Sequence, residues 1–285
     1  MKSLVVGGAG FIGAHLVGRL LSEGREVAVL DPSLVSLDWS KELRRNMHYF
    51  SGSTSDRKML AAAVRGAEEV YHLAAVPDLA WCEEHPAEAM EHNALSVADV
   101  LQAAVGAGVR RFVYASSWKV YGMRGKLSEE VETHPDTVYG VTKLIGEQVA
   151  RAYGCQHGLD VSVLRLFNVY GPGASRGVVR AFVEAARAGQ ILRVFDPHAE
   201  RDFVHVWAVV DAFLGAEPGT YNVGTGRATS IEDLARMVAW AADVKVEIEE
   251  GGPGLRAWAD TERARKEFGW STRVSLEEGL KEMLA

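Results

Sequence analysis

Short apolar runs alternate with helically spaced apolar residues along the first 170 positions of the chain. A short apolar run bounded by glycine or charged residues is typical of a buried strand, and apolar residues repeated every three or four positions are typical of an amphipathic helix. The runs predict strands at residues 3–6, 26–30, 69–73, 111–115 and 161–166, and the spacing predicts helices at 11–21, around 60–64, at 83–105 and at 139–153. Strands that alternate with helices need right-handed crossovers, so the pattern predicts an α/β fold with a Rossmann-type, doubly wound parallel sheet.

The pattern changes after Gly171-Pro172, where the predicted elements become shorter and more mixed. They are helices at residues 178–188, 231–240, 261–268 and 276–284, and strands at 191–194 and 221–223. Pieces of this kind predict a smaller mixed α/β lobe that faces a substrate. We therefore expect a first domain over residues 1–170 and a substrate-binding lobe over residues 171–285, with room for some later segments to return to the first domain.

Composition and charge argue against several classes of protein. The chain has 285 residues, of which 48% are hydrophobic, and this is enough for a sizeable core. Its net charge of −7, without a basic stripe, argues against a nucleic-acid partner, and no run of about 18 apolar residues predicts a membrane span. Two distant cysteines, Cys82 and Cys155, exclude a disulfide scaffold, and no cysteine or histidine spacing predicts a metal site. The first residues do not resemble a secretory signal, so a cytoplasmic location is expected.

A glycine-rich loop joins the first predicted strand to the first predicted helix. Its glycines permit a tight turn, close approach of a pyrophosphate to the backbone, and close packing of helix on strand, while the helix N-terminus offers N–H groups to phosphates. Asp31 ends the second strand, where a carboxylate binds the adenosine ribose hydroxyls and repels a 2′-phosphate. The loop therefore predicts NAD, rather than NADP, as the cofactor; the alternative is a tight turn followed by a helix-capping aspartate. The candidate cofactor-binding residues are Gly7, Gly10, Phe11, Ile12, Gly13 and Asp31.

A tyrosine and a lysine four residues apart, Tyr139 and Lys143, begin a predicted helix and share one of its faces. A nearby ammonium favours the ionised form of a phenol, whose ordinary pKa is about 10, and makes it usable as a base near neutral pH. Ser117 follows the fourth predicted strand, at the carboxyl edge of the sheet where ligands bind in such folds, and its hydroxyl can hold a reacting alcohol. These three residues are the catalytic candidates, although a tyrosine and a lysine at this spacing also occur together by chance.

A series of motifs extends these observations over nearly the whole chain. They are Gly7-Gly-Ala-Gly-Phe-Ile-Gly13, Tyr71-His-Leu-Ala-Ala75, Ser116-Ser-Trp-Lys-Val-Tyr-Gly122, Tyr139-Gly-Val-Thr-Lys143, Arg165-Leu-Phe-Asn-Val-Tyr-Gly-Pro172, Arg201-Asp-Phe-Val-His205 and Tyr221-Asn-Val-Gly224. In this order they resemble the extended short-chain dehydrogenase/reductase family, in its NAD-dependent epimerase/dehydratase group, with UDP-glucose 4-epimerases as the nearest familiar members. The resemblance implies NAD as the cofactor and a nucleotide sugar as the substrate.

The resemblance also implies roles for individual residues. Further cofactor-binding residues would be Leu73, Ala74, Ala75, Asn93, Ser116 and Tyr139, together with Lys143, which would hold the nicotinamide ribose. Ser117 would bind the reacting sugar, and Asn168 and Arg201 would bind the nucleotide diphosphate. The residues by themselves leave two alternatives open: a turn residue before Gly171 for Asn168, and a surface ion pair with Asp202 for Arg201. The helices at 83–105 and at Tyr139 would form a homodimer interface, unless their alanine-rich faces pack within one chain.

Some positions depart from the family pattern. Trp118 and Lys119 stand where dehydratases and decarboxylases of this group have acids. Tryptophan cannot transfer a proton and lysine is a poor substitute for a carboxylate, which argues against dehydration and, less firmly, against decarboxylation. The adenine-binding acid is replaced by Ser53, and Glu249-Glu250 stand where an arginine commonly holds the substrate phosphate, with Arg256 as the nearest replacement.

Together, the motifs and departures predict an NAD-dependent 4-epimerase that acts on a UDP-sugar through a 4-keto intermediate. An NAD-dependent sugar dehydrogenase or reductase and a decarboxylase of the same family are the alternative enzymes. A non-catalytic NAD(H)-binding protein is a further alternative. The complete set of Ser117, Tyr139 and Lys143 argues against it, because a protein without activity has no physical need for all three.

Overall fold

The computed structural model describes residues 1–33, 45–122, 124–249, 251 and 254–285, and the chain forms two compact units. The first unit comprises Met1–Gly122, Glu132–Arg165 and Phe213–Tyr221, and the second comprises Met123–Val131, Leu166–Ala212 and Asn222–Ala285. The units therefore interleave along the chain. Within the described ranges, no helix is both long and apolar enough to cross a membrane.

A seven-stranded sheet forms the centre of the first unit, with the strand order β12-β7-β5-β4-β1-β2-β3. The strands are β1 (Lys2–Val6), β2 (Glu26–Asp31), β3 (Met47–Ser51), β4 (Glu69–His72), β5 (Arg111–Ser117), β7 (Asp160–Leu166) and β12 (Gly219–Val223). The pairs from β3 through β2, β1 and β4 to β5 are parallel. This arrangement confirms the predicted Rossmann-type sheet, because buried apolar strands linked by helical crossovers can align in this way.

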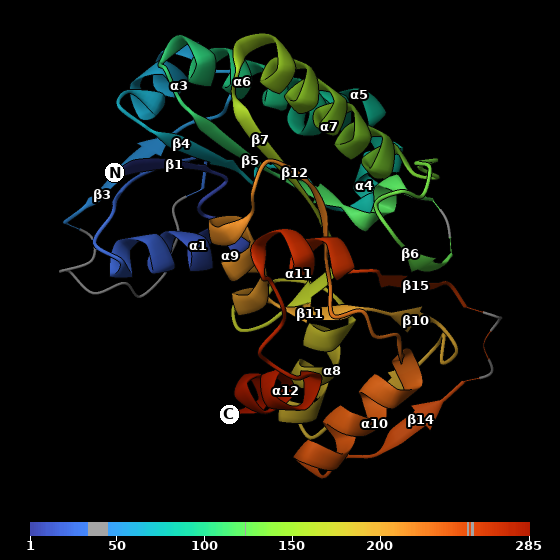
Figure 1. Cartoon of the computed structure of the whole chain (residues 1–285). Helices are drawn as coiled ribbons and strands as arrows, with labels where there is room; N and C mark the ends of the chain where they lie inside the picture. The colour runs from blue at the N-terminus through green and yellow to red at the C-terminus, as the bar shows by residue number, and fades with distance from the viewer. Residues whose placement is uncertain (34–44, 123, 250, 252–253) are drawn as a thin grey trace. The chain divides into compact units, whose positions relative to one another are not determined.

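Helices cover both faces of this sheet (Figure 1). On one face, α3, α6 and α7 enclose a core with the strands, and α1 packs on β1 and β2. The core between them includes Leu4, Leu60, Val97, Phe112 and Tyr114. The helices of the first unit are α1 (Phe11–Ser22), α3 (Arg57–Val64), α4 (Leu79–Glu84), α5 (Pro86–Met90), α6 (Ser96–Gly106) and α7 (Val138–His157).

The predicted helix at 83–105 is wrong as a continuous element. The helix α4 ends before His85, whose φ of −129° and ψ of 61° are not helical, because a proline at position 86 disfavours the helical conformation of the residue before it. The chain then continues through α5, a π-helical turn (Glu91–Leu95) and α6. The strand expected at 221–223 is β12, the edge strand of the large sheet, and its residues up to Tyr221 belong to the first unit, as a later segment that returns to it. The edge strand β3 was not predicted.

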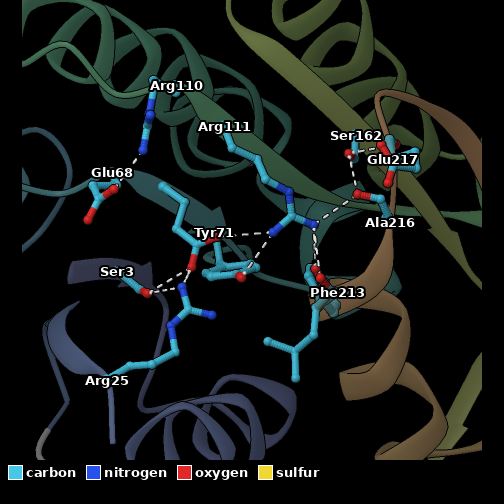
Figure 2. Close-up of polar contacts among 12 residues, drawn as sticks. Ser3, Arg25, Glu68, Tyr71, Arg110, Arg111, Ser162, Phe213, Ala216 and Glu217 are labelled. Carbon is cyan, nitrogen blue, oxygen red and sulfur yellow. Dashed lines mark hydrogen bonds and ion pairs between the residues drawn. The ribbon is translucent and has the colours of Figure 1, made fainter. Parts of the chain in front are cut away.

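A polar network at the beginning of β5 holds the segment that leads into β12 (Figure 2). Arg111 donates from Nη2 to the carbonyl oxygens of Phe213 (3.0 Å) and Ala216 (2.9 Å), and from Nη1 to the Glu69 carboxylate (3.1 Å). The same carboxylate, which is buried, pairs with Arg25. Ser162 adds a bond to the carbonyl oxygen of Glu217 (2.8 Å). Arg111 thereby satisfies carbonyl groups at the C-terminal end of the helix α9 (Val206–Gly215), more than 100 positions further along the chain.

The second unit consists of short strands and helices around its own core. Its helices are α8 (Val178–Arg187), α10 (Ile231–Ala242), α11 (Glu262–Phe268) and α12 (Leu276–Leu284), while α9 (Val206–Gly215) runs across the boundary between the units. Its strands are β6 (Gly125–Leu127), β8 (Asn168–Tyr170), β9 (Leu192–Val194), β10 (Glu200–Arg201), β11 (Phe203–His205), β13 (Thr229–Ser230), β14 (Val246–Ile248) and β15 (Arg256–Ala259). They form sheets with the orders β13-β10-β15-β6, β11-β8 and β14-β9. A smaller mixed α/β part was expected, and all four of its predicted helices are present.

Candidate functional site

The glycine loop forms a cradle between β1 and α1. Gly7 has a φ of +81°, and a Cβ atom on it would lie 2.5 Å from the backbone nitrogen of Ala74. A Cβ atom on Gly13 would lie 2.2 Å from the carbonyl oxygen of Gly7. Only glycine therefore fits at both positions. Gly10 is the N-cap of α1 and provides no side-chain cap, so the first turn, with Phe11 and Ile12, offers backbone N–H groups that can bind a phosphate.

A cavity of about 450 Å³ lies against this cradle, entirely within the first unit. Asp31 lies at its wall with both carboxylate oxygens engaged: Oδ2 accepts from the N–H of Ala9 (3.0 Å) and Oδ1 from the N–H of Ser33 (2.9 Å). The remaining lone pairs of this carboxylate can accept hydrogen bonds from two adjacent hydroxyl groups. The cavity is lined, among others, by Gly7, Gly10, Asp31, Ser53, Leu73, Ala74 and Ala75. The close glycine packing, the helix N-terminus and the carboxylate fit a dinucleotide.

Asn93 is fully buried behind the wall of this cavity. Its Oδ1 accepts from the N–H of Val76 (2.7 Å), and its Nδ2 donates to the carbonyl oxygen of Val76 (3.1 Å). Val76 itself lines the cavity. The π-helical turn that contains Asn93 was not foreseen, and the structure places this side chain as a support for the loop after β4.

The catalytic candidates come from β5 and α7, which pack on each other. Ser117 is the last residue of β5. Thr137 caps α7 by accepting from the N–H of Gly140 (3.1 Å), and the helix then presents Tyr139 and Lys143 on successive turns. Tyr139 is half-buried, whereas Lys143 is only 2% exposed. Burial lowers the pKa of the Lys143 ammonium to about 7, although the Glu147 carboxylate raises it.

Glu147, one turn after Lys143, was missed by sequence reasoning. It is fully buried and accepts from Ser116 Oγ (2.5 Å), Arg165 Nε (3.0 Å) and Arg151 Nη2 (2.8 Å). The hydroxyl of Ser116, predicted to contact a cofactor, is therefore directed at α7. The available sequence signal was an acid four residues after the lysine on the same helix face.

Asn168 and Arg201 lie in the second unit. Asn168 begins β8 and its Nδ2 donates to the carbonyl oxygen of Asp202 (3.2 Å), so the alternative of a turn residue is wrong. Arg201 donates from Nη1 to the carbonyl oxygens of Glu200 and Leu255. The ion pair with Asp202 is also wrong, because that buried carboxylate instead accepts from Thr225, Gly226 and Ala259.

The residues that depart from the family pattern have identifiable contacts. Trp118 is buried, and Lys119 Nζ lies 4.6 Å from the centroid of its ring. Arg256 pairs with the Glu200 carboxylate (2.7 Å). Glu249 follows β14, and Glu250 lies outside the described residues.

Comparisons with known proteins agree with this geometry. A model of the NAD dependent epimerase/dehydratase family matches residues 3–224. A UDP-glucose 4-epimerase of Mycolicibacterium smegmatis is 35% identical, over 98% of this chain and 96% of that protein. The crystal structure of a UDP-glucose 4-epimerase of Thermotoga maritima with UDP-glucose is 31% identical, with a TM-score of 0.89, and covers 100% of this chain and 97% of that one. A Thermus thermophilus UDP-glucose 4-epimerase in complex with NAD is 30% identical, with a TM-score of 0.86, over 100% and 98% of the two chains.

Other similar proteins include a dehydratase and decarboxylases of nucleotide sugars, so the family contains several activities. The family match covers most of the chain and includes the glycine cradle, the end of β5 and the start of α7. NAD is the cofactor that this family uses. The chain belongs to the NAD-dependent epimerase/dehydratase family, whose members act on nucleotide sugars.

Proposed function

We propose that this protein is an NAD-dependent 4-epimerase of a UDP-sugar. The observation that carries the proposal is the buried Lys143 one turn after Tyr139 on α7, in the same unit as the glycine cradle and the Asp31 cavity. A buried ammonium beside a phenol favours proton removal from a sugar hydroxyl. The UDP-glucose 4-epimerases to which the chain is similar support the choice of nucleotide and reaction.

The proposed roles follow from the chemistry of each side chain. Tyr139 Oη takes the proton from the C4 hydroxyl and later returns it, and the Lys143 ammonium stabilises the phenolate in between. Ser117 Oγ orients the same hydroxyl at the end of β5. NAD⁺, when bound over the glycine cradle, supplies reversible hydride chemistry at C4, so that the sugar passes through a 4-keto form. Asn168 and Arg201 are proposed to bind the UDP diphosphate.

Dehydration and decarboxylation need additional acid–base groups near the sugar ring. The positions that would provide them hold Trp118, which is buried, and Lys119, whose ammonium lies against the Trp118 ring. An indole carries no exchangeable acid of useful pKa, and an ammonium is a poor substitute for a carboxylate, so these positions argue against dehydration and, less firmly, against decarboxylation. Epimerisation requires only one acid–base residue, which favours it over the alternatives.

Incubation of the purified protein with a panel of UDP-hexoses and UDP-uronates tests this proposal. We expect one C4 pair to interconvert without added cofactor, as followed by NMR of the sugar anomeric protons. A steady change in absorbance of added NAD⁺ or NADH would instead indicate a dehydrogenase or reductase, and release of CO₂ from a uronate would indicate a decarboxylase. Lack of turnover with every UDP-sugar would contradict the proposal.

We also propose that the protein is a homodimer. An apolar groove on the first unit is lined by Ala87, Met90, Glu91, Ala94, Leu95, Ala98, Ile145 and Val149, from α5, the π-helical turn, α6 and α7. Of the residues that line it, Leu95 is 56% exposed and Met90 is also exposed. Exposed apolar side chains gathered at one groove are typical of an interface between protein chains. A second copy is the expected occupant, since a helical face of this kind can pair with itself.

Replacement of Leu95 by Glu should convert the dimer into a monomer, because a carboxylate buried against apolar side chains is strongly unfavourable. Light scattering after gel filtration measures this, with two chains of 31.0 kDa expected for the unchanged protein. Trp240→Glu is the matched control, since Trp240 is 84% exposed on α10 of the other unit. A monomer before any substitution, or a Leu95→Glu protein that stays dimeric, would refute the interface.

A further inference from the structure

The buried ammonium of Lys143 lies on an aromatic ring of the sheet. Its Nζ is 4.6 Å from the centroid of the Tyr114 ring, and Tyr114 belongs to β5. Tyr114 is fully buried, so little water competes for the cation. A cation held against a ring face is stabilised more strongly when it is desolvated than at an exposed site. The ring is thus an electrostatic partner of Lys143 that the family motifs do not indicate.

The orientation of the Tyr114 ring is held by its surroundings. A Cβ atom on Gly146 of α7 would lie 2.3 Å from Tyr114 Oη, so glycine at this point leaves the space that the phenol fills. Oη also approaches the carbonyl oxygen of Lys143 at 3.4 Å. From β4, the His72 ring stacks on Tyr114 with centroids 5.8 Å apart and an interplanar angle of 17°. The ring therefore has little freedom to move away from the ammonium.

The charges around this ring leave Lys143 as the cation of the group. Burial lowers the pKa of His72 to about 3, and repulsion from Lys143 contributes to a smaller extent, so the imidazole stays neutral. Burial raises the pKa of Tyr114, and electrostatic interactions with Tyr139 and Glu147 raise it further, so that phenol stays neutral. Burial lowers the pKa of Lys143 itself to about 7, and Glu147 raises it. A pKa near neutrality makes the protonated state of Lys143 sensitive to the groups that contact its ammonium.

We propose that Tyr114 is a positioning residue, whose ring face holds Lys143 as an ammonium on the Tyr139 side of α7 and thereby keeps Tyr139 ready to accept a proton. This inference rests on the proposed function only in taking Tyr139 and Lys143 as the acid–base pair. If the ring is removed, Lys143 loses its proton at a lower pH, and the Tyr139 phenolate then forms only at a higher pH.

A titration of the Tyr139 phenolate tests the role without requiring turnover. The near-ultraviolet phenolate absorbance of the full chain as purified is recorded against pH, and that of a Tyr139→Phe protein is subtracted. Tyr114→Leu should raise the Tyr139 midpoint by about one pH unit, since loss of a desolvated cation–π contact is of that order. Tyr114→Phe keeps the ring and should leave the midpoint within about 0.3 units of the original.

A second variant guards against loss of folding in the leucine protein. Gly146→Ala adds a methyl group where Tyr114 Oη lies, so it should displace the ring and raise the midpoint in the same direction. Unchanged midpoints in the folded Tyr114→Leu and Gly146→Ala proteins would overturn the role of Tyr114 alone. A Tyr139 that shows no depressed midpoint in the unaltered protein would overturn the Tyr139–Lys143 pair, and with it the chemistry of the proposed function.

Discussion

Replacement of Tyr139 by Phe should lower kcat for C4 epimerisation by about 10³-fold, because a positioned acid–base group contributes roughly 10²- to 10⁴-fold. The substitution removes the phenolic oxygen that accepts the proton and keeps the ring on the first turn of α7. Neither Tyr139 nor Lys143 lines the cavity at Gly7 and Asp31, so that cavity should retain its shape. We therefore expect NAD to be bound to the same extent. Kinetics on the UDP-sugar identified by the panel, with cofactor content measured in the same preparation, provide the comparison.

The control for this experiment lies on the same helix. Tyr153→Phe also removes one phenolic oxygen from α7, but at a residue packed against the core formed with α3 and α6, and it should retain activity. A Tyr139→Phe protein with activity close to that of Tyr153→Phe would exclude Tyr139 as the base. Loss of both activity and bound NAD would instead indicate that Tyr139 serves the cofactor rather than the proton transfer.

Replacement of Glu147 by Ala should lower the free energy of unfolding by about 3–5 kcal/mol, because removal of one partner leaves an uncompensated buried charge. Arg165 is 4% exposed and donates to Glu147 from both Nε (3.0 Å) and Nη2 (2.8 Å). Its Nη1 has no hydrogen-bond partner in the described residues, the Tyr121 ring centroid lies 4.8 Å from its guanidinium carbon, and Glu147 supplies its ion pair. Burial and Glu147 act in opposite directions on the Arg165 pKa, and the carboxylate prevails, so that the pKa is raised. Urea unfolding followed by circular dichroism measures the change.

Two variants separate this effect from a general cost of substitution. Arg236→Ala breaks an exposed pair with Glu232 on α10, and it should leave the unfolding curve almost unchanged. Glu147→Gln retains one acceptor for Arg165, so its urea midpoint should lie between those of Glu147→Ala and Arg236→Ala. If Glu147→Ala and Arg236→Ala shift the urea midpoint equally, the buried network does not stabilise the first unit.

Local patterns in the sequence account for the strands, the glycine loop and the beginning of α7. Gly7 and Gly13 were identified from their spacing, and the structure supplies the reason, since a Cβ atom at either position would collide with backbone. Tyr139 and Lys143 share a helix face because of their spacing alone. The break before Pro86 was readable from the proline and was overlooked, because the apolar spacing of the surrounding residues continues through it.

Short-range spacing and residue type were enough to predict the parallel sheet apart from its edge strand β3, the cofactor loop and the family. The partners of the buried side chains became known from the three-dimensional fold: Val76 for Asn93, Ser116 and Arg165 for Glu147, and the Tyr114 ring for Lys143. The tertiary structure also decided that β12 joins the large sheet beside β7. These contacts join residues that are distant in the chain, and a buried polar group pairs with whichever partner the packing brings within hydrogen-bonding distance, so local patterns do not predict them.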